Sequence, residues 1–264
     1  MRPRHAVGAY PAYLFDVDGT LLYPERAVPG AAEALRTLKQ RGRAVLAVTN
    51  NSSLGRREIA DRFRSLGLPL ADEDVFSALS ATARLIARER PGATVHVFGS
   101  PGLRAEVEAV GLVPVEGDTA DYVVVGNNRG ATFDWLTAAM RALLGGARFV
   151  AVNADRMYVG PDGGLIPGAG VWVAGLERAV ARGPDVVVGK PSVTLLLQAA
   201  ASTGRDVADC LYVGDNPEAD VGGAHAAGMD ALLVLTGVAA AADECPQPPE
   251  HVLPSVADLP RMLL

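Results

Sequence analysis

Short apolar runs alternate with helical patterns along most of the 264 residues of this chain. This alternation restricts the fold, because repeated strand and helix segments build a parallel sheet with helices packed against its faces. We expect buried strands at Ala12–Phe15, Ala44–Val48, Val95–Phe98, Tyr122–Val125, Phe149–Val152, Val186–Val188, Leu211–Val213 and Ala231–Leu235. We expect helices at Ala31–Gln40, Arg56–Leu66, Ala81–Arg90, Leu103–Val110, Thr132–Leu144, Val171–Ala181 and Val193–Thr203. The predicted fold class is therefore α/β.

Composition excludes several classes of partner. The formal net charge is −6 and both signs are scattered, so we expect neither a nucleic-acid polymer nor a membrane surface as a partner. No apolar run approaches the ~20 residues of a membrane-spanning helix. Cys210 and Cys245 are the only cysteines, too few for a disulfide framework or a structural zinc site. This cysteine usage favours a reducing, cytoplasmic location.

Two carboxylates follow the first predicted strand, in the run Phe15-Asp16-Val17-Asp18-Gly19-Thr20. Residues two apart in a strand point the same way, so Asp16 and Asp18 could both face one pocket at its carboxyl end. Open α/β sheets bind their ligands at that edge. A turn stabilised by Asp side chains is the alternative interpretation. An EF-hand calcium loop does not fit, because Ala27 stands where that loop needs its Glu.

Three further polar clusters follow predicted strands, at Thr49–Ser53, Gly189–Ser192 and Gly214–Asp220. If the parent strands lie side by side and parallel, all of these clusters meet at one edge of one sheet. The Thr49–Ser53 cluster fits a helix N-cap and a phosphate contact equally well. The two interpretations are compatible, because an exposed helix N-terminus attracts anions.

Lysine is rare in this chain, which makes Lys190 informative. The sequence has 24 basic residues, and all of them are arginines except Lys39 and Lys190. Lys39 lies in a predicted surface helix, whereas Lys190 follows a buried strand. A compact ammonium can enter a narrow pocket as a point charge, where a planar guanidinium would not fit.

These residue types suit phosphoryl transfer from a small phosphomonoester. Asp16 is the candidate nucleophile, because a carboxylate can attack a phosphoryl group and form an aspartyl-phosphate. Asp18 is the candidate that protonates the leaving oxygen and later accepts a proton from water. Thr49, Asn50 and Lys190 offer the hydroxyl, amide and ammonium donors that the phosphoryl oxygens need.

A magnesium site is expected beside the nucleophile. Asp215 and Asp16 together offer the hard oxygen ligands that Mg²⁺ prefers. Such an ion would also keep Asp16 ionised and close to an anionic substrate that it would otherwise repel. The expected cofactor is therefore Mg²⁺.

Three other motif classes do not fit the spacing of the residues in this chain. Gly189-Lys190-Pro191-Ser192 is not a P-loop, because Pro191 stands where Ser or Thr must follow the lysine. Gly168-Ala169-Gly170 is not a dinucleotide-binding motif, because Val173 replaces its third glycine. The four histidines have no metal-ligand spacing, and the chain has no G-x-S-x-G sequence of a serine hydrolase.

Taken together, the four clusters resemble the motifs of the haloacid dehalogenase-like superfamily, in its capped phosphatase branch. The D-x-D-G-T motif is met by Asp16 to Thr20, and the strand ending in T-N-N-S by Thr49 to Ser52. Gly189-Lys190-Pro191 meets the third motif, and Gly214-Asp215 through Asp220 meets G-D-x-x-x-x-D. The resemblance covers nearly the whole chain.

The resemblance implies a Rossmann-like core domain with an inserted α/β cap that chooses the leaving group. The core would comprise residues 1–80 and 186–264, and the cap residues 81–185. It implies phosphorylation of Asp16 and acid/base work by Asp18. It also implies Mg²⁺ held by Asp16, Asp215 and the backbone carbonyl of Asp18, with Asp220 ligating or orienting nearby. Relatives often pair through their caps, so a homodimer is possible.

Departures from the family pattern lie mainly in the cap. The branch usually has G-L-D or G-x-D where this chain has Gly126-Asn127-Asn128, and T-N-x-D where it has Val152-Asn153-Ala154-Asp155. These departures leave the chemistry intact and the substrate open. Two alternative functions remain at this point, namely a phosphotransferase or phosphomutase of the same superfamily, and a non-catalytic phosphate-binding protein.

Overall fold

The computed structural model describes residues 3–160, 164–241 and 245–262. The chain divides into two compact units. Unit 1 comprises Met1–Thr49, Arg57–Phe76 and Lys190–Leu264, and unit 2 comprises Asn50–Arg56 and Ser77–Gly189. None of the helices in the described ranges is long and apolar enough to cross a membrane.

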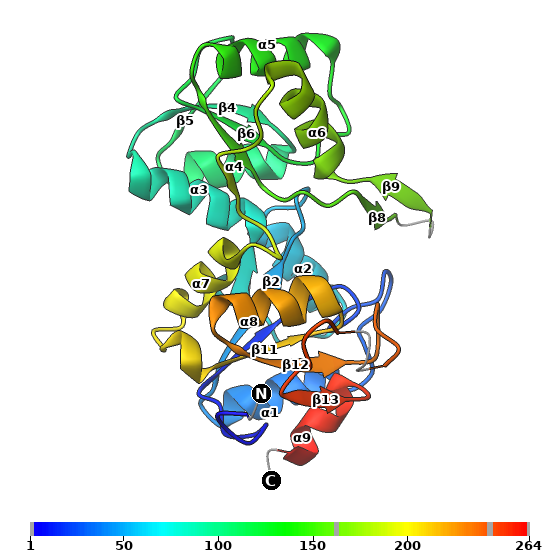
Figure 1. Ribbon diagram of the computed structural model, residues 1–264. Helices are drawn as coiled ribbons and strands as arrows, with labels where there is room; N and C mark the ends of the chain where they lie inside the picture. Colours follow the sequence, from blue (N-terminus) through cyan, green and yellow to red (C-terminus); the bar gives the residue numbers. More distant parts are fainter. Residues whose placement is uncertain (1–2, 161–163, 242–244, 263–264) are drawn as a thin grey trace. The chain divides into compact units, whose positions relative to one another are not determined.

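Unit 1 contains one six-stranded sheet in the order β13-β12-β11-β1-β2-β3. Its strands are β1 (Ala12–Phe15), β2 (Ala44–Thr49), β3 (Val75–Ser77), β11 (Cys210–Gly214), β12 (Asp230–Val234) and β13 (His251–Leu253). Its helices are α1 (Ala31–Gln40), α2 (Arg56–Ser65), α7 (Val193–Ser202), α8 (Gly223–Ala227) and α9 (Leu259–Met262). Figure 1 shows α7 and α8 on one side of this sheet and α1 with α9 on the other. The central strands are therefore buried on both faces, which explains their uninterrupted apolar runs.

Strand β1 lies at the centre of this sheet and is parallel to both neighbours. Phe15 pairs with Ala47 of β2 on one side and with Val213 of β11 on the other. The chain runs from β1 to β2 on one side and reaches β11 on the other only after all of unit 2. Such a change of direction leaves a crevice at the carboxyl ends of the strands, where ligands bind in this class of fold.

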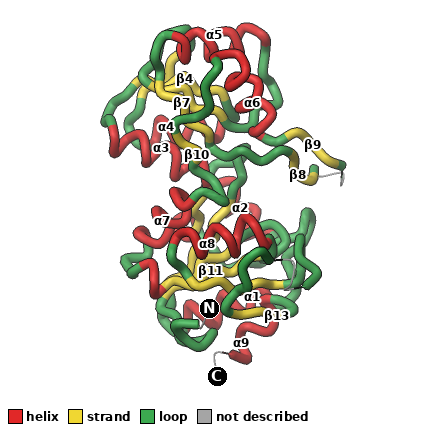
Figure 2. Tube along the Cα trace, in the orientation of Figure 1, coloured by secondary structure: helices red, strands yellow, loops and turns green. Residues whose placement is uncertain are grey.

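Unit 2 contains a second parallel sheet, in the order β10-β7-β6-β4-β5, and a separate antiparallel hairpin (Figure 2). The sheet is built from β4 (Thr94–Phe98), β5 (Val113–Val115), β6 (Tyr122–Val125), β7 (Arg148–Ala151) and β10 (Val186–Val187). The hairpin consists of β8 (Met157–Val159) and β9 (Leu165–Pro167). The helices are α3 (Ala78–Glu89), α4 (Pro101–Ala109), α5 (Phe133–Leu144) and α6 (Ala169–Val180). Both units are α/β, so the predicted fold class is confirmed.

All eight expected strands are present, and the differences concern short elements and helix starts. The strands β3, β5, β8, β9 and β13 have three residues each, too few for a recognisable pattern. Helix α3 begins at Ala78, three residues before the expected start, because the Ser77 hydroxyl accepts a hydrogen bond from the N–H of Ser80. The expected boundary between residues 80 and 81 therefore lies inside a helix.

The core of unit 2 gathers the chain's two tryptophans around a buried phenylalanine. Phe149 of β7 is fully buried in a cluster that also contains Phe98, against which Trp135 and Trp172 pack. The rings of Phe98 and Trp172 meet edge to face, with their centres 5.4 Å apart. Tryptophan fluorescence therefore reports on the unfolding of this unit alone.

We expect Phe149→Ala to destabilise unit 2 by about 3–5 kcal/mol, because it leaves a cavity in a close-packed core. Urea unfolding followed by tryptophan fluorescence measures the change. Phe133→Ala is the matched control, since Phe133 is 83% exposed on α5 and should change stability by less than about 0.5 kcal/mol. Equal shifts in the two variants would contradict this account of the core.

Candidate active site

Lys190 lies between two buried carboxylates of unit 1. Its Nζ donates to Asp16 Oδ1 at 2.5 Å and to Asp220 Oδ1 at 2.7 Å. The side chains of Lys190 and Asp220 are 4% and 1% exposed. The ammonium also lies 5.4 Å from the centre of the Tyr212 ring, on β11. The rare lysine singled out by the sequence is thus a buried cation fixed by opposite charges.

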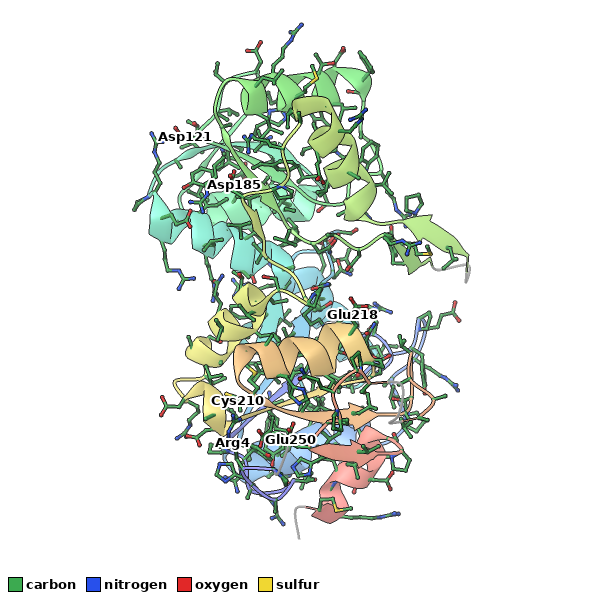
Figure 3. The ribbon with its side chains drawn as sticks, in the orientation of Figure 1. Arg4, Asp121, Asp185, Cys210, Glu218 and Glu250 are labelled. Carbon is green, nitrogen blue, oxygen red and sulfur yellow. The ribbon has the colours of Figure 1, made fainter. Side chains whose placement is uncertain are left out.

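Neighbouring strands place the acids at the same sheet edge. Asp16 directly follows β1, and its backbone N–H donates to the carbonyl of Val213 on β11 at 2.8 Å. Asp215 directly follows β11, and Figure 3 marks Cys210 at the start of this strand and Glu218 in the π-helix Pro217–Gly222 beyond its end. Because the strands are parallel and in register, their carboxyl ends bring Asp16 and Asp215 together.

Asp16, Asp215 and Asp220 form a group in which one carboxylate oxygen from each lies within 4.8 Å of the others. Asp220, in the π-helix Pro217–Gly222, fixes the two residues before that helix, because its Oδ2 accepts the N–H groups of Asp215 at 3.1 Å and Asn216 at 3.0 Å. Asp215 Oδ2 accepts the N–H of Val238 at 2.6 Å. Backbone donors therefore fix the orientation of two of the three acids.

In the part of the chain that the structure describes, the acids of this group form ion pairs with one cation, Lys190. Burial on its own would lower the pKa of Lys190, but Asp16 and Asp220 outweigh it and hold that pKa well above the usual value. Burial raises the pKa of Asp215, and the charge of Asp220 raises it further. The group thus contains three carboxylates and the single ammonium of Lys190. The donor set suits a hard divalent cation, which binds carboxylate oxygens and supplies the missing positive charge.

Glycines leave the space that the acids occupy. A Cβ added to Gly214 would overlap the carboxylate of Asp220, and one added to Gly237 would overlap that of Asp215. Gly19 has φ of +88°, a conformation that favours glycine, and a Cβ there would lie 2.5 Å from Asp215 Oδ2. Only glycine at these positions allows the backbone to approach the acids so closely.

Asp18 lies in the loop after β1 and its side chain is exposed. Partial desolvation nevertheless raises the pKa of Asp18 above its ordinary value, against the charges of Arg62 and Lys190. The loop is closed by the N–H of Gly19, which donates to the carbonyl of Leu22 at 2.8 Å. A carboxyl group with a raised pKa is suited to giving and taking a proton.

The two residues of the second motif fall on opposite sides of a unit boundary. Thr49 is the last residue of β2, is 3% exposed and belongs to unit 1. Asn50 belongs to unit 2, where its Nδ2 contacts both carboxylate oxygens of Asp155 at 3.2 Å. The carbonyl of Asn50 accepts a hydrogen bond from Asn153 Nδ2 at 2.6 Å. The structure therefore brings four predicted site residues together in one group, namely Asp16, Lys190, Asp215 and Asp220. Asn50 instead forms hydrogen bonds with Asp155 and Asn153 of unit 2.

Sequence reasoning missed the segment after β12. The hydroxyl of Thr236 donates to the carbonyl of Gly19 at 2.6 Å, and Val238 donates to Asp215. This segment was detectable, because Thr236-Gly237 follows a buried strand just as the four recognised clusters do. The partnership of Asn50 with Asp155 had no such signal, since 105 residues separate them.

Comparisons with known proteins agree with this geometry. A haloacid dehalogenase-like hydrolase model matches residues 13–113, and a HAD-hydrolase-like model matches residues 187–259. The 5'-nucleotidase YutF of Bacillus subtilis is 40% identical over 229 residues, which cover 87% of this chain and 88% of that protein.

Solved structures match over both units. The p-nitrophenyl phosphatase of Archaeoglobus fulgidus has a TM-score of 0.90 and 38% identity, covering 96% of this chain and 98% of that one. A glycerol phosphate phosphatase of Mycobacterium tuberculosis, in complex with calcium, has a TM-score of 0.86 and 35% identity, covering 96% of this chain and 75% of that one. Fold and relatives together define an α/β enzyme that hydrolyses phosphoric monoesters. The chain belongs to the haloacid dehalogenase-like hydrolase family.

We expect Gly237→Ala to weaken divalent-cation binding at least about tenfold, because the added methyl group displaces the Asp215 carboxylate. Isothermal titration with Mg²⁺ measures the affinity. Gly175→Ala on α6 is the control, since a Cβ there meets no atom within 4 Å. Unchanged binding in Gly237→Ala would show that Asp215 does not contribute to a cation site.

Proposed function

We propose that this chain is a Mg²⁺-dependent phosphatase that hydrolyses a small phosphomonoester through an aspartyl-phosphate on Asp16. The observation that supports the proposal most directly is the position of Lys190. Its Nζ contacts the carboxylates of both Asp16 and Asp220, and Asp215 lies beside them. Such an arrangement places a nucleophile, a fixed cation and a set of oxygen ligands in one buried group. Phosphoryl transfer needs these three elements together.

Asp16, Asp215 and the backbone carbonyl of Asp18 would hold Mg²⁺, with Asp220 ligating it or orienting its ligands. The support is the imbalance of three buried carboxylates against one ammonium. When bound, the ion neutralises negative charge shared by the carboxylates and the phosphoryl oxygens. Mg²⁺ fits better than a soft metal, because the three acids of the group offer carboxylate oxygens as ligands.

The protein groups would carry out two successive displacements. Asp16 attacks phosphorus, and the P–O bond to the leaving group breaks as Asp18 donates its proton to the departing oxygen. Water then attacks the phosphorus of the aspartyl-phosphate, giving its proton to Asp18 and releasing Asp16 with inorganic phosphate. Thr49, Asn50 and Lys190 would bind the phosphoryl oxygens during both steps.

Unit 2 would act as the inserted cap, whose predicted range is residues 81–185. The relatives carry names that refer to nucleotides, sugar phosphates, glycerol phosphate and nitrophenyl phosphate, which supports a small soluble phosphomonoester for this chain.

We also propose a cytoplasmic location and a homodimer formed through the cap. The free Cys210 thiol, buried in β11, is consistent with a reducing compartment.

We expect Asp16→Asn to abolish turnover, a fall of about a thousandfold or more, because an amide is a poor nucleophile. Phosphate release from p-nitrophenyl phosphate measures the rate, and circular dichroism checks folding. Asp61→Asn is the control, since Asp61 has a half-exposed side chain on α2. Substantial residual activity in a folded Asp16→Asn protein would refute the covalent route.

Chelation with EDTA should remove activity, and added Mg²⁺ should restore it, because the three acids alone repel an anionic substrate. Activity is measured at rising Mg²⁺ after chelation, with Ca²⁺ in a parallel series. Ca²⁺ should bind without restoring full turnover, since its coordination is larger and looser. Full activity in the presence of EDTA would exclude a metal-dependent mechanism.

A further inference from the structure

The proposed reaction steps give no role to Tyr212, a buried tyrosine beside Lys190. Tyr212 is the middle residue of β11, where it pairs with Leu14 of β1 and Ala231 of β12. Its side chain is buried, and the centre of its ring lies 5.4 Å from Lys190 Nζ. Both residues belong to unit 1. Tyr212 therefore forms part of the immediate surroundings of the cation in this site.

The hydroxyl of Tyr212 is an unusual group to bury. Among the described residues it has no partner in hydrogen-bond geometry. The buried Tyr10 and Tyr13 of the same unit differ, because they donate to Asp230 Oδ2 at 2.6 Å and to the carbonyl of Val7 at 2.7 Å. A buried hydroxyl without a partner costs free energy that a phenylalanine of the same shape avoids. Stability alone therefore does not explain the Tyr212 hydroxyl.

The charges around this hydroxyl come from the site itself. Burial raises the pKa of Tyr212 well above its usual value, and the ammonium of Lys190 is the strongest effect that opposes the rise. The carboxylates of Asp220 and Asp16 raise that pKa further. The phenol therefore keeps its proton, and its oxygen still has lone pairs to offer to an N–H donor.

Formation of the proposed aspartyl-phosphate would change the partners of Lys190. One oxygen of Asp16 forms the bond to phosphorus, and the electron pair of the broken P–O bond departs with the leaving group. Asp16 then carries no carboxylate charge, so the contact from Lys190 Nζ to Asp16 Oδ1, 2.5 Å in this structure, loses its charged acceptor. A buried ammonium that loses such an acceptor needs another one.

We propose that Tyr212 is a positioning residue, whose hydroxyl accepts a hydrogen bond from Lys190 Nζ once Asp16 is phosphorylated. The three N–H groups of the ammonium would then have acceptors in Asp220, in a phosphoryl oxygen and in Tyr212. The hydroxyl keeps its own proton throughout and acts only through Lys190. This inference rests on the proposed phosphatase function and adds a residue that serves the phosphorylated state of its site.

Tyr212→Phe tests whether the hydroxyl serves this state. The variant should lower kcat for p-nitrophenyl phosphate about tenfold, the scale of one hydrogen bond to a charged group, and change KM less than about twofold. KM is spared because Asp16 is still a carboxylate, paired with Lys190, when the substrate binds. Steady-state release of nitrophenol measures both constants.

Two inhibitors separate the phosphorylated state from the free carboxylate. Beryllium fluoride, added with Mg²⁺, bonds to a carboxylate oxygen and imitates an aspartyl-phosphate, whereas inorganic phosphate leaves Asp16 ionised. Tyr212→Phe should raise the inhibition constant of beryllium fluoride about tenfold and that of inorganic phosphate less than about twofold.

Tyr10→Phe is the matched control, because it removes a buried hydroxyl that contacts Asp230 and His251 in unit 1. It should lower the melting temperature and leave kcat, KM and both inhibition constants unchanged. Tyr212→Phe should have the opposite effects. Its melting temperature should be equal to that of the wild type or higher, because the hydroxyl that it removes has no partner among the described residues.

The possible results separate this inference from the function that it extends. No phosphate release from p-nitrophenyl phosphate by the wild-type protein would overturn the proposed function. An unchanged kcat in Tyr212→Phe, or a raised KM with unchanged kcat, would overturn this inference alone. Equal inhibition of wild type and Tyr212→Phe by beryllium fluoride would overturn it as well. A lower melting temperature with unchanged kinetics would show that the hydroxyl serves only the fold.

Discussion

The site in unit 1 depends on the ion pairs that Lys190 makes with Asp16 and Asp220. Burying three carboxylates so close together is costly, and one ammonium at 2.5 Å and 2.7 Å offsets part of that cost. The same pairs fix where Asp16 points, because rotating its carboxylate away would break the ion pair with the buried Lys190. The protein therefore fixes the carboxylate of the proposed nucleophile. Among the described residues the group keeps a net negative charge, which is the electrostatic condition for holding a divalent cation.

Backbone geometry provides the space for these charges. The parallel strands β1 and β11 end together, so Asp16 and Asp215 leave the sheet at one edge. Gly214 and Gly237 then let the chain pass against the carboxylates of Asp220 and Asp215, where any side chain would overlap them. Because these glycines do no chemistry themselves, they carry the function only through the positions of the acids.

The sequence predicted the parts of the fold and site that depend on local pattern. Buried strands are recognisable as apolar runs, and the polar clusters that follow several of these runs contain Asp16, Lys190 and Asp215. Partnerships across long separations could not be predicted in the same way. Asn50 reads as a phosphate donor or a helix cap, yet its side-chain amide contacts Asp155, which only the packing of unit 2 brings near. The three-residue strands, such as β8 with Tyr158, carry too little pattern to be recognised.

The chain crosses between its units at two of the motifs that the sequence singled out. One crossing is the peptide bond between Thr49 and Asn50, and another is that between Gly189 and Lys190. On the unit 2 side, Asn50 is held by Asn153 and Asp155, and a Cβ on Gly189 would press on Asn50 and Asn153. On the unit 1 side, Lys190 is held by its two carboxylates. Two residues proposed to bind phosphate, Asn50 and Lys190, thus lie at the connections between the units, so strain at these connections would act on the proposed phosphate contacts.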